Sequence, residues 1–319
     1  MIEDARIAVV IPCYKPDDRV VEVVRGIGPE TDLIIVVDDA CPQKSGEMLC
    51  SACDDPRLHV VNLPNNLGVG GATKAGWLKA RELGADILVK LDADGQMDPA
   101  LIPAIAGPVV QGQADYAKGN RFFNPSGLAT MPWVRLMGNA LLSFLTKLSS
   151  GYWNIFDPVN GYTALHAKLL PLMDMDKIDN RYFFESDVLF RLGIARAVVW
   201  DVPMNARYGD EPSHLQPFRI GPEFFYKNLR NFLKRIVFSY YLRDFRPASL
   251  NLGVGLPLTV AGVGLGLWTW LRNAAESRYT SAGQVMMAAL PIIVGSQMML
   301  SAMNEDIQNV PKRPVHPLL

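Results

Sequence analysis

The chain has 319 residues and a formal net charge of −1, with 31 Lys and Arg residues against 32 Asp and Glu residues. This length exceeds that of one ordinary domain, and the balanced charge excludes a general electrostatic attraction to nucleic acid. Nucleic acid is therefore not expected among its partners.

The four cysteines, Cys13, Cys41, Cys50 and Cys53, offer little support for a metal or redox site. Cys50 and Cys53 form a CxxC pair with His59 nearby, but zinc sites of this kind need a second pair of ligands, which the sequence lacks. Reduced structural thiols are the expected state. Acidic residues precede the first short apolar run, so the N-terminus is not expected to be a secretory signal peptide.

Four short apolar runs predict buried strands, at residues 6–14, 32–40, 57–63 and 86–94. A helix is expected over residues 68–84, because that segment begins and ends in glycine and has helical spacing between. Since the runs are apolar on both faces and alternate with helical patterns, we predict an α/β domain with a mostly parallel sheet. Ligands of such sheets collect at the carboxyl ends of the strands, where the acidic clusters of this chain fall.

The densest acidic cluster follows the fourth run in LVKLDADGQMDP, where Asp92, Asp94 and Asp98 surround Gln96 in the sequence. Carboxylates this close repel one another, so the cluster needs a cation or a cage of hydrogen bonds. Mg²⁺ or Mn²⁺ on a diphosphate takes one or two carboxylates from the protein, and Gln96 adds an oxygen without adding repulsion. We therefore predict a divalent metal on Asp92, Asp94 and Gln96, with a solvated turn as the alternative.

Two uncharged apolar stretches, residues 249–271 and 284–303, are long enough to cross a bilayer. A buried core hairpin is the alternative. Positive residues flank the first stretch, and Lys312 and Arg313 follow the second. This pattern predicts a hairpin in the inner (cytoplasmic) membrane, with the N-terminal domain and both termini in the cytoplasm.

Residues 217–247, directly before the first stretch, combine aromatic with basic residues. Phe224, Leu229 and Phe232 share one predicted helical face, whereas Arg230 falls on another. Basic amphipathic helices lie in the headgroup layer, so we predict that this segment contacts the lipid bilayer. The alternative is a helix that caps the globular domain.

Four motifs, VVIPCYKPDD, LIIVVDDAC, NNLGVGGATKAG and LVKLDADGQMDP, occur in the order in which family 2 glycosyltransferases carry them. The chain resembles this family, whose members have the GT-A fold. It is most similar to the polyprenyl-phosphate glycosyltransferases, such as dolichol-phosphate mannose synthases and bactoprenol glucosyltransferases. That narrower resemblance depends on KGNRF, DPVNGYTAL, YFFESDVLFRLG, VPMNARYGDEPSHL and the two terminal apolar stretches.

The resemblance implies four parts: a Rossmann-like GT-A domain at 1–216, amphipathic juxtamembrane helices at 217–247, a transmembrane hairpin at 248–304 and a cytoplasmic tail at 305–319. It implies metal-dependent transfer of a sugar from a UDP- or GDP-sugar to a membrane polyprenyl phosphate, for cell-envelope glycans. A lipid phosphate is already anionic near neutral pH, so it needs no base to attack.

The resemblance also implies roles for single residues. The nucleotide pocket would be lined by Pro12, Tyr14, Asp38 and Asp39, and Lys74 would approach the diphosphate. Guanidinium groups bind phosphate oxygens bidentately, which makes arginines the candidates for the acceptor phosphate. These arginines are Arg121, Arg135 and Arg207, of which Arg207 is the strongest candidate.

Two acids complete the expected site. Asp157 would orient the acceptor or the sugar, and Asp187 would act as a base of the kind that family 2 uses. Both could instead cap turns. Ser186 separates Glu185 from Asp187 where many relatives have adjacent acids, so which of the two acts stays open.

Two rival functions also stay open. A synthase that glycosylates a sugar hydroxyl would carry a QxxRW motif, and QPFRI at 216–220 has Ile220 in place of the tryptophan. A non-enzymatic scaffold would not need the three predicted metal ligands together. The sequence does not predict the sugar, the nucleotide base or the oligomeric state, and a homo-oligomer is compatible with it.

Overall fold

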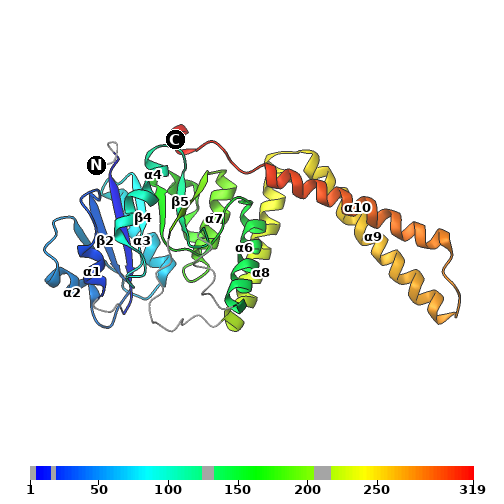
Figure 1. The fold of residues 1–319 in the computed structure, drawn as a ribbon, viewed down its shortest axis with the longest axis horizontal. Helices are drawn as coiled ribbons and strands as arrows, with labels where there is room; N and C mark the ends of the chain where they lie inside the picture. The colour runs from blue at the N-terminus through cyan, green and yellow to red at the C-terminus, as the bar shows by residue number, and fades with distance from the viewer. Residues whose placement is uncertain (1–4, 16–18, 124–132, 205–216) are drawn as a thin grey trace. The chain divides into compact units, whose positions relative to one another are not determined.

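The computed structural model describes residues 5–15, 19–123, 133–204 and 217–319 (Figure 1). The chain divides into two compact units. The first unit comprises Met1–Phe232 together with Pro311–Leu319, and the second comprises Leu233–Val310.

The first unit contains one seven-stranded sheet with the strand order β3-β2-β1-β4-β6-β5-β7. Its strands are β1 (Ile7–Cys13), β2 (Leu33–Asp38), β3 (Leu58–Asn62), β4 (Ile87–Lys90), β5 (Tyr116–Asn120), β6 (Thr163–His166) and β7 (Val199–Pro203). Only β6 runs antiparallel to its neighbours β4 and β5, and the other pairings are parallel. The predicted α/β fold with a mostly parallel sheet is therefore confirmed.

Helices follow most of the strands, as expected where parallel strands need crossover connections. The α-helices of this unit are α1 (Arg19–Arg25), α2 (Ser45–Ala52), α3 (Val69–Glu82), α4 (Ile102–Val110), α6 (Trp133–Ser150), α7 (Phe184–Ala195) and the larger part of α8 (Pro217–Val237). Short 3₁₀ turns are η1 (Pro99–Leu101), η2 (Ala167–Leu172), η3 (Met175–Lys177) and η5 (His316–Leu318).

The central strand β1 shows why the sheet is covered on both faces. Ile7, Val9 and Ile11 share one buried cluster with side chains of α1 and α4. Val10 points the other way, against Gly76 of α3, where no side chain intervenes. Alternate residues of one strand thus serve two helical layers, which is why the sequence is apolar at every position.

The four strands and the helix predicted from the sequence are confirmed as β1 to β4 and α3. The fourth strand ends earlier than predicted, at Lys90. The acidic cluster therefore lies entirely in the loop after β4, where its side chains are not confined to alternating faces of a strand.

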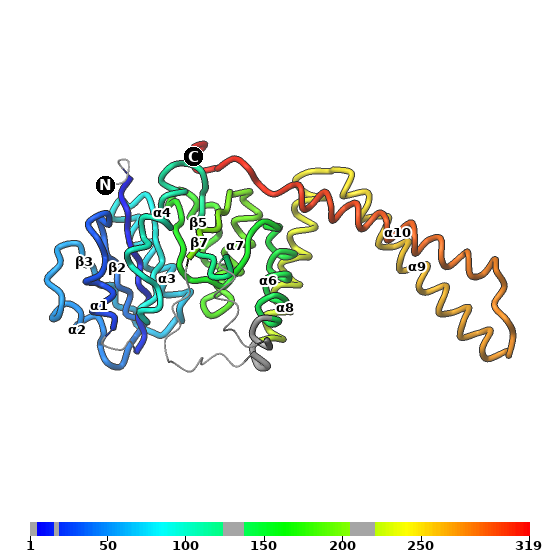
Figure 2. Tube along the Cα trace, viewed as in Figure 1, coloured from blue at the N-terminus to red at the C-terminus, as the bar shows by residue number. Residues whose placement is uncertain are grey.

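The C-terminal segment (red in Figure 2) packs on the first unit instead of forming the separate tail expected at 305–319. The fully buried Asp115 accepts hydrogen bonds from the backbone N–H groups of Val315 (2.9 Å) and His316 (2.8 Å). The His316 ring lies 2.8 Å from the same carboxylate and stacks on His166, with ring centroids 4.3 Å apart. The predicted boundary at 216 also moves, because α8 belongs to the first unit as far as Phe232.

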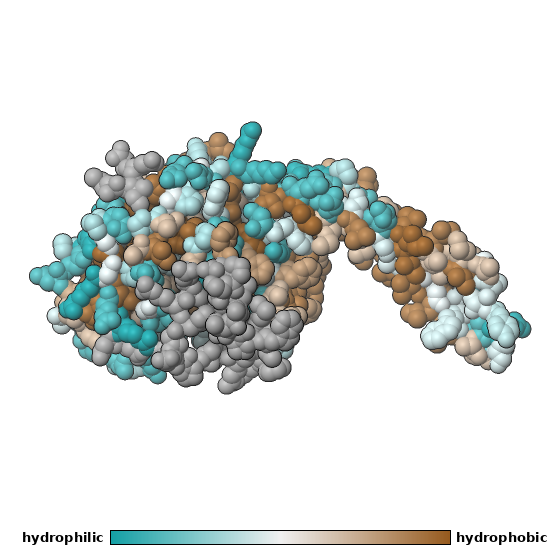
Figure 3. All heavy atoms as spheres, viewed as in Figure 1, coloured by the Kyte–Doolittle hydropathy of each residue, from teal (hydrophilic) through white to brown (hydrophobic). Residues whose placement is uncertain are grey.

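The second unit is a pair of long helices, α9 (Pro247–Ala275) and α10 (Ala282–Gln308), preceded by a short π-helix, η4 (Phe238–Arg243). The helices pack closely at small residues: a Cβ added at Gly262 would lie 2.8 Å from a side-chain atom of Ile292. Both are long and apolar enough to cross a membrane, and only 11% and 17% of their apolar windows are buried. Apolar side chains gather on their surface in Figure 3. This exposure argues against the buried core hairpin.

Candidate active site

The carboxyl ends of β1, β2 and β4 form one edge of the sheet, because these strands are parallel neighbours. Cys13 pairs with Asp38 in register, so Tyr14 and Asp39 follow at this edge, together with the acidic loop after Lys90. The residues predicted for the nucleotide and the metal therefore belong to adjacent strand ends, as the sequence indicated.

Asp92 and Asp94 provide the carboxylates of the acidic loop. Asp92 Oδ1 accepts a hydrogen bond from Lys90 Nζ at 2.7 Å, and Asp94 Oδ1 accepts one from the backbone N–H of Gln96 at 2.9 Å. Burial and the charge of Asp92 raise the pKa of Asp94, although the hydrogen bond from Gln96 opposes them. A carboxylate whose ionised form is disfavoured in this way, beside a second carboxylate, fits a site that a cation completes.

Among the described residues, no group of three or more His, Cys, Asp and Glu side chains is arranged to hold a metal by itself. Two carboxylates and a neutral oxygen suit Mg²⁺ or Mn²⁺ only where a diphosphate supplies further oxygens. Asp92, Asp94 and Gln96 therefore fit a metal that arrives with a nucleotide diphosphate, and their assignment stays a prediction.

Lys90 is a residue of this site that the sequence did not bring out. Its side chain is almost fully buried, and its Nζ also lies 3.3 Å from Oε1 of Glu185. Burial alone would lower its pKa, but the charges of Asp92 and Glu185 outweigh burial and raise it. A lysine within the otherwise apolar run ILVK was the available signal.

The two acids at the start of α7 have separate roles in the structure. Glu185 approaches Lys90 and hence the acidic loop. Asp187 instead accepts hydrogen bonds from the backbone N–H of Asp179 (3.0 Å) and from Nδ2 of Asn231 (2.9 Å), so it joins α7 to α8. The geometry favours Glu185 as the acid of the site, and the predicted role of Asp187 as a base finds no support in these contacts.

Asp38 and Asp39 are both buried, and their carboxylates hold backbone segments. Asp38 accepts hydrogen bonds from the N–H groups of Cys41 and Gly46 and from the Ser45 hydroxyl. The Asp39 carboxylate accepts hydrogen bonds from the backbone N–H groups of residues 67 and 68, at 2.6 and 2.8 Å. These bonds fix the loops around the expected nucleotide pocket, so a positioning role is supported, and direct contact with a base stays a prediction.

Tyr14 and Lys74 differ in how their side chains are used. Tyr14 is 46% exposed, so its ring is accessible at the carboxyl end of β1, next to Pro12. Lys74 Nζ donates hydrogen bonds to the carbonyl oxygens of Met175 (3.1 Å) and Ile178 (2.9 Å). Contact between Lys74 and a diphosphate stays a prediction that requires these bonds to break.

Asp157 and Arg121 form a bidentate ion pair. Arg121 donates from Nε and Nη2 to the two carboxylate oxygens of Asp157, each at 2.7 Å. Burial opposes ionisation of Asp157, yet the Arg121 guanidinium outweighs burial and holds the pKa of Asp157 below its usual range. Asp157 has a positive φ of 53°, an uncommon conformation that non-glycine residues adopt where the surroundings fix it.

A second buried lysine fixes the loop that carries Asp157. Lys118 of β5 pairs with Asp201 of β7 at 2.9 Å and donates to the carbonyl oxygens of Phe156 and Asp157. Asp201 also accepts a hydrogen bond from the N–H of Phe156 at 2.7 Å. Further along the same loop, Gly161 lies against Lys90 and Asp92. One loop therefore connects the Arg121 ion pair with the predicted metal ligands.

Two predicted acceptor ligands cannot be placed. Arg207 lies outside the described residues, and Arg135 lies in α6 at a position whose side chain is not among those described. Their roles stay predictions from the sequence.

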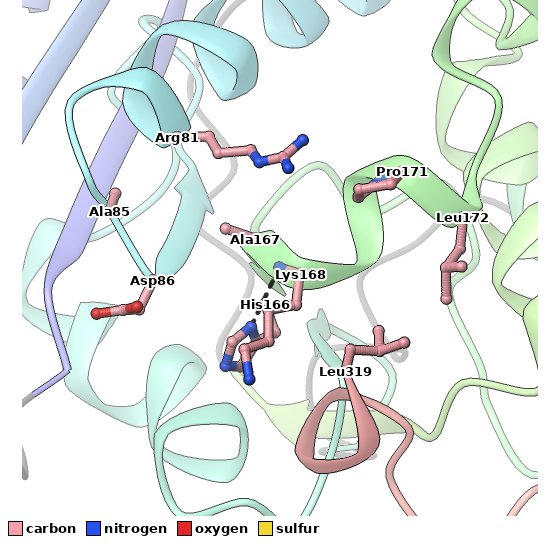
Figure 4. Close-up of a pocket in the computed structure, with 9 residues that line it drawn as sticks. All are labelled: Arg81, Ala85, Asp86, His166, Ala167, Lys168, Pro171, Leu172 and Leu319. Atoms are coloured by element: carbon pink, nitrogen blue, oxygen red, sulfur yellow. Dashed lines mark hydrogen bonds between the residues drawn. The ribbon is translucent and has the colours of Figure 1, made fainter.

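The pocket drawn in Figure 4 is a separate feature. Its wall includes Asp86 and His166, which lie at the amino end of β4, because Ile87 pairs with His166. That edge is opposite to the one that carries the acidic loop, so this pocket is not the candidate active site.

The model of the family described as Glycosyl transferase family 2 matches residues 8–171, just over half of the chain. The chain is a family 2 glycosyltransferase. The matched segment runs from β1 to η2 and so contains the acidic loop, Arg121 and Asp157.

Among curated relatives of this glycosyltransferase is the UDP-N-acetylglucosamine–dolichyl-phosphate N-acetylglucosaminyltransferase of Methanococcus voltae. The two are 30% identical over 219 residues, which cover 64% of this chain and 87% of the relative. The undecaprenyl-phosphate mannosyltransferase of Micrococcus luteus is 31% identical over 204 residues, covering 62% of this chain and 82% of the relative.

Among solved structures, the glucosyl-3-phosphoglycerate synthase of Mycobacterium tuberculosis, crystallised with Mn²⁺ and UDP, has a TM-score of 0.55 to this chain. The similarity covers 73% of this chain and 81% of that chain at 18% sequence identity, so it supports the GT-A-like fold alone. The predicted family, fold and glycosyltransferase activity are confirmed.

Proposed function

We propose that this glycosyltransferase transfers a sugar from a nucleotide-sugar to a membrane polyprenyl phosphate, with Mg²⁺ or Mn²⁺ on the donor diphosphate. The observation that carries the proposal is the loop at residues 156–161. At Gly161 it lies beside the predicted metal ligand Asp92, and through Asp157 it holds the guanidinium of Arg121. A donor diphosphate and an acceptor phosphate would thus be bound by one connected framework.

Bound to Asp92, Asp94 and Gln96, a divalent metal would supply charge stabilisation for the departing nucleoside diphosphate. An acceptor phosphate oxygen forms the new bond to the anomeric carbon, and the bond from that carbon to the diphosphate breaks. Inversion at this carbon is implied by the family resemblance. Arg121 and Arg207 orient the acceptor phosphate, while Asp157 holds Arg121 in place. No general base is needed, in accord with the structural contacts of Asp187.

The relatives support the acceptor class, since their names specify a dolichyl phosphate and an undecaprenyl phosphate. The alternative is a hydroxyl acceptor, which would require a base. Glu185 is the acid that favours this alternative, because it lies near the acidic loop. Burial raises the pKa of Glu185 although the ammonium of Lys90 opposes this, and the carboxylate is already engaged with that ammonium at 3.3 Å.

A direct transfer assay tests the acceptor. Purified full-length protein in nanodiscs is given UDP- and GDP-sugars with Mn²⁺, and one of three acceptors: undecaprenyl phosphate, undecaprenol or a glycolipid. We expect transfer to the phosphate and none to the alcohol, because only the phosphate is a charged nucleophile at neutral pH. Transfer to the hydroxyl acceptors without transfer to the phosphate would overturn the assignment.

Helices α6 and α8 of the first unit support contact with the bilayer, because each buries some polar residues and exposes several large apolar ones. Helix α8 also exposes the basic residues Arg230 and Lys234, as a basic interfacial helix does. Ser149 of α6 donates a hydrogen bond to Asn228 of α8 at 2.6 Å, and both residues are buried. Leu141 of α6 and Leu229 of α8 are exposed by 61% and 43%. Further exposed apolar residues on these helices are Met137, Phe144, Phe225 and Tyr226. Helices in water normally show the reverse pattern, and an interfacial helix accounts for this one.

The route of the chain supports the proposed topology. The second unit begins at Leu233, within α8, and ends at Val310, before the segment that packs on Asp115, so both of its ends connect through the chain to the first unit. If α9 and α10 both span the bilayer, the first residues of α9 and the last residues of α10 lie on the same side of it, and the chain leads from both to the first unit. The basic residues that flank them favour the cytoplasmic side.

Fluorescence quenching by brominated lipids tests the helix contact in the full-length protein. Leu141→Trp and Leu229→Trp are expected to add fluorescence that the lipid quenches, relative to wild type. Leu78→Trp is the matched control, because Leu78 is 49% exposed on α3, away from both helices. Equal quenching of all three variants would show that α6 and α8 do not meet the bilayer.

A further inference from the structure

Lys90 is shared between two carboxylates that belong to different parts of the chain. Its Nζ lies 2.7 Å from Asp92 Oδ1 on the loop after β4 and 3.3 Å from Glu185 Oε1 on α7. Its side chain has a relative exposure of 2%, and those of Asp92 and Glu185 are 29% and 11% exposed, so water screens these charges only in part. A lysine buried this deeply would be very costly without such partners.

The ionised side chains around Lys90 have a net negative charge. Asp92, Asp94 and Glu185 carry three negative charges when ionised, and Lys90 carries one positive charge. These four groups together carry an excess of negative charge, and Arg19, whose charge also acts on Asp94, offsets only part of it. Without Lys90 the metal-free site would hold three carboxylates against Arg19, and repulsion among them would destabilise it.

The two carboxylate oxygens of Asp92 have different neighbours. Oδ1 is bonded to Lys90, whereas Oδ2 lies beside Gly161, where an added Cβ would come within 2.7 Å of it and 2.6 Å of Lys90 Nζ. Lys90 therefore competes with a metal for one oxygen of Asp92 and orients the carboxylate as a whole.

We propose that Lys90 is an internal cation that balances the metal-free site, and that Glu185 sets how strongly Lys90 competes with the metal for Asp92. The Glu185 carboxylate also attracts the ammonium of Lys90 and so weakens the interaction of that ammonium with Asp92. Both are positioning residues that set metal affinity, and neither contacts the metal. This inference rests on the metal site of the proposed function.

Substitutions of Lys90 and Glu185 are expected to change the metal affinity in opposite directions. Removing the charge of Lys90 makes the site more negative, so the metal-free protein becomes less stable and the metal binds more tightly. Removing the charge of Glu185 leaves Lys90 to Asp92 alone, so the metal binds more weakly. One unit charge a few ångströms away in a buried site changes the affinity for a divalent cation by about tenfold or more.

Binding of Mn²⁺ to the full-length protein at saturating UDP or GDP tests the inference, because the predicted ligands suit the metal only together with a diphosphate. It is measured as free Mn²⁺ by electron paramagnetic resonance, against a blank with the nucleotide alone, and as the thermal shift on adding Mn²⁺. We expect Lys90→Met to lower the Kd for Mn²⁺ about tenfold and to enlarge the thermal shift. We expect Glu185→Gln to raise the Kd about tenfold and to reduce the shift. The double variant Lys90→Met/Glu185→Gln should return close to the wild-type Kd.

Arg57→Met is the control, because Arg57 pairs with Asp55 at 2.8 Å and donates to the carbonyl oxygens of Gly28 and Thr31 instead of contacting a predicted metal ligand. It should lower stability without changing the Mn²⁺ shift, which separates a specific effect from a general loss of packing. Glu185→Gln keeps the side-chain shape, so the test stands even where Lys90→Met fails to fold.

The outcomes distinguish a failure of this inference from a failure of the proposed metal site. If wild type binds Mn²⁺ and both variants shift the Kd in the same direction, or neither shifts it, the inference is overturned and the metal site stands. If neither wild type nor Lys90→Met responds to Mn²⁺, the metal assignment and the inference are overturned together.

Discussion

Replacing Asp94 with alanine is expected to lower the rate of sugar transfer by at least about a hundredfold while leaving the fold and membrane association intact. Among the described residues, the Asp94 carboxylate accepts a hydrogen bond from the N–H of Gln96 in its own turn, so its loss removes a predicted metal ligand and little packing. The measurement is transfer at saturating donor over a series of Mn²⁺ concentrations, with melting temperature as the check on folding.

Asp98→Asn provides the matched control in the same loop. Asp98 caps the turn η1 by accepting a hydrogen bond from the N–H of Ala100 at 3.1 Å, and asparagine caps such a turn equally well. This variant should keep wild-type turnover. Near wild-type turnover of Asp94→Ala at saturating Mn²⁺ would instead remove Asp94 from the metal site.

The sheet could be predicted because its evidence is local. The runs ending at Cys13, Asp38 and Lys90 are short, mostly apolar and bounded by turn residues, so their burial follows from their own composition. The run ending at Asn62 forms the outermost strand, β3, which is only partly buried. The position of the candidate site follows equally, since the carboxyl ends of neighbouring parallel strands must share an edge.

The roles of single side chains could not be predicted in this way, because they depend on contacts between distant segments. Glu185 and Asp187 are two residues apart on α7, about half a helical turn, so they point in different directions. One meets Lys90 and the other meets Asn231 of α8. No local pattern specifies which acid meets the acidic loop, because Lys90 lies ninety-five positions earlier in the chain.

The amphipathic segment shows a similar limit. The sequence predicted one apolar face of α8 that contacts lipid. In the structure this face is divided: Leu229 is exposed, whereas Phe224 packs on Phe183 with ring centroids 5.3 Å apart. The buried side of α8 also carries Asn228 and Asn231, which are bonded to Ser149 and Asp187. Buried asparagines require specific partners, which become visible only once α6 and α7 are in place.

The ion pair of Arg121 and Asp157 allows acceptor binding to be separated from stability. Arg121→Ala leaves Asp157 as a buried charge without its guanidinium partner, which should destabilise the fold by about 3–5 kcal/mol. The same variant should raise the KM for undecaprenyl phosphate about tenfold to a hundredfold, because a charge-assisted bond to phosphate is lost. Nucleotide-sugar binding should change little.

The double variant Arg121→Ala/Asp157→Asn decides between the two effects, since it removes the uncompensated charge along with the guanidinium. We expect stability to recover while the KM for the lipid phosphate stays high. Asp157 has a folded pKa below its usual value of 3.8, so the pair stabilises the wild type above that pH, and this stability is lost as the pH falls through the folded pKa. Urea unfolding between pH 7 and pH 2 should show this loss in wild type and a smaller one in the double variant. If the double variant also regains the wild-type KM, Arg121 serves the loop alone, and the acceptor phosphate must be bound elsewhere, with Arg207 as the first residue to test.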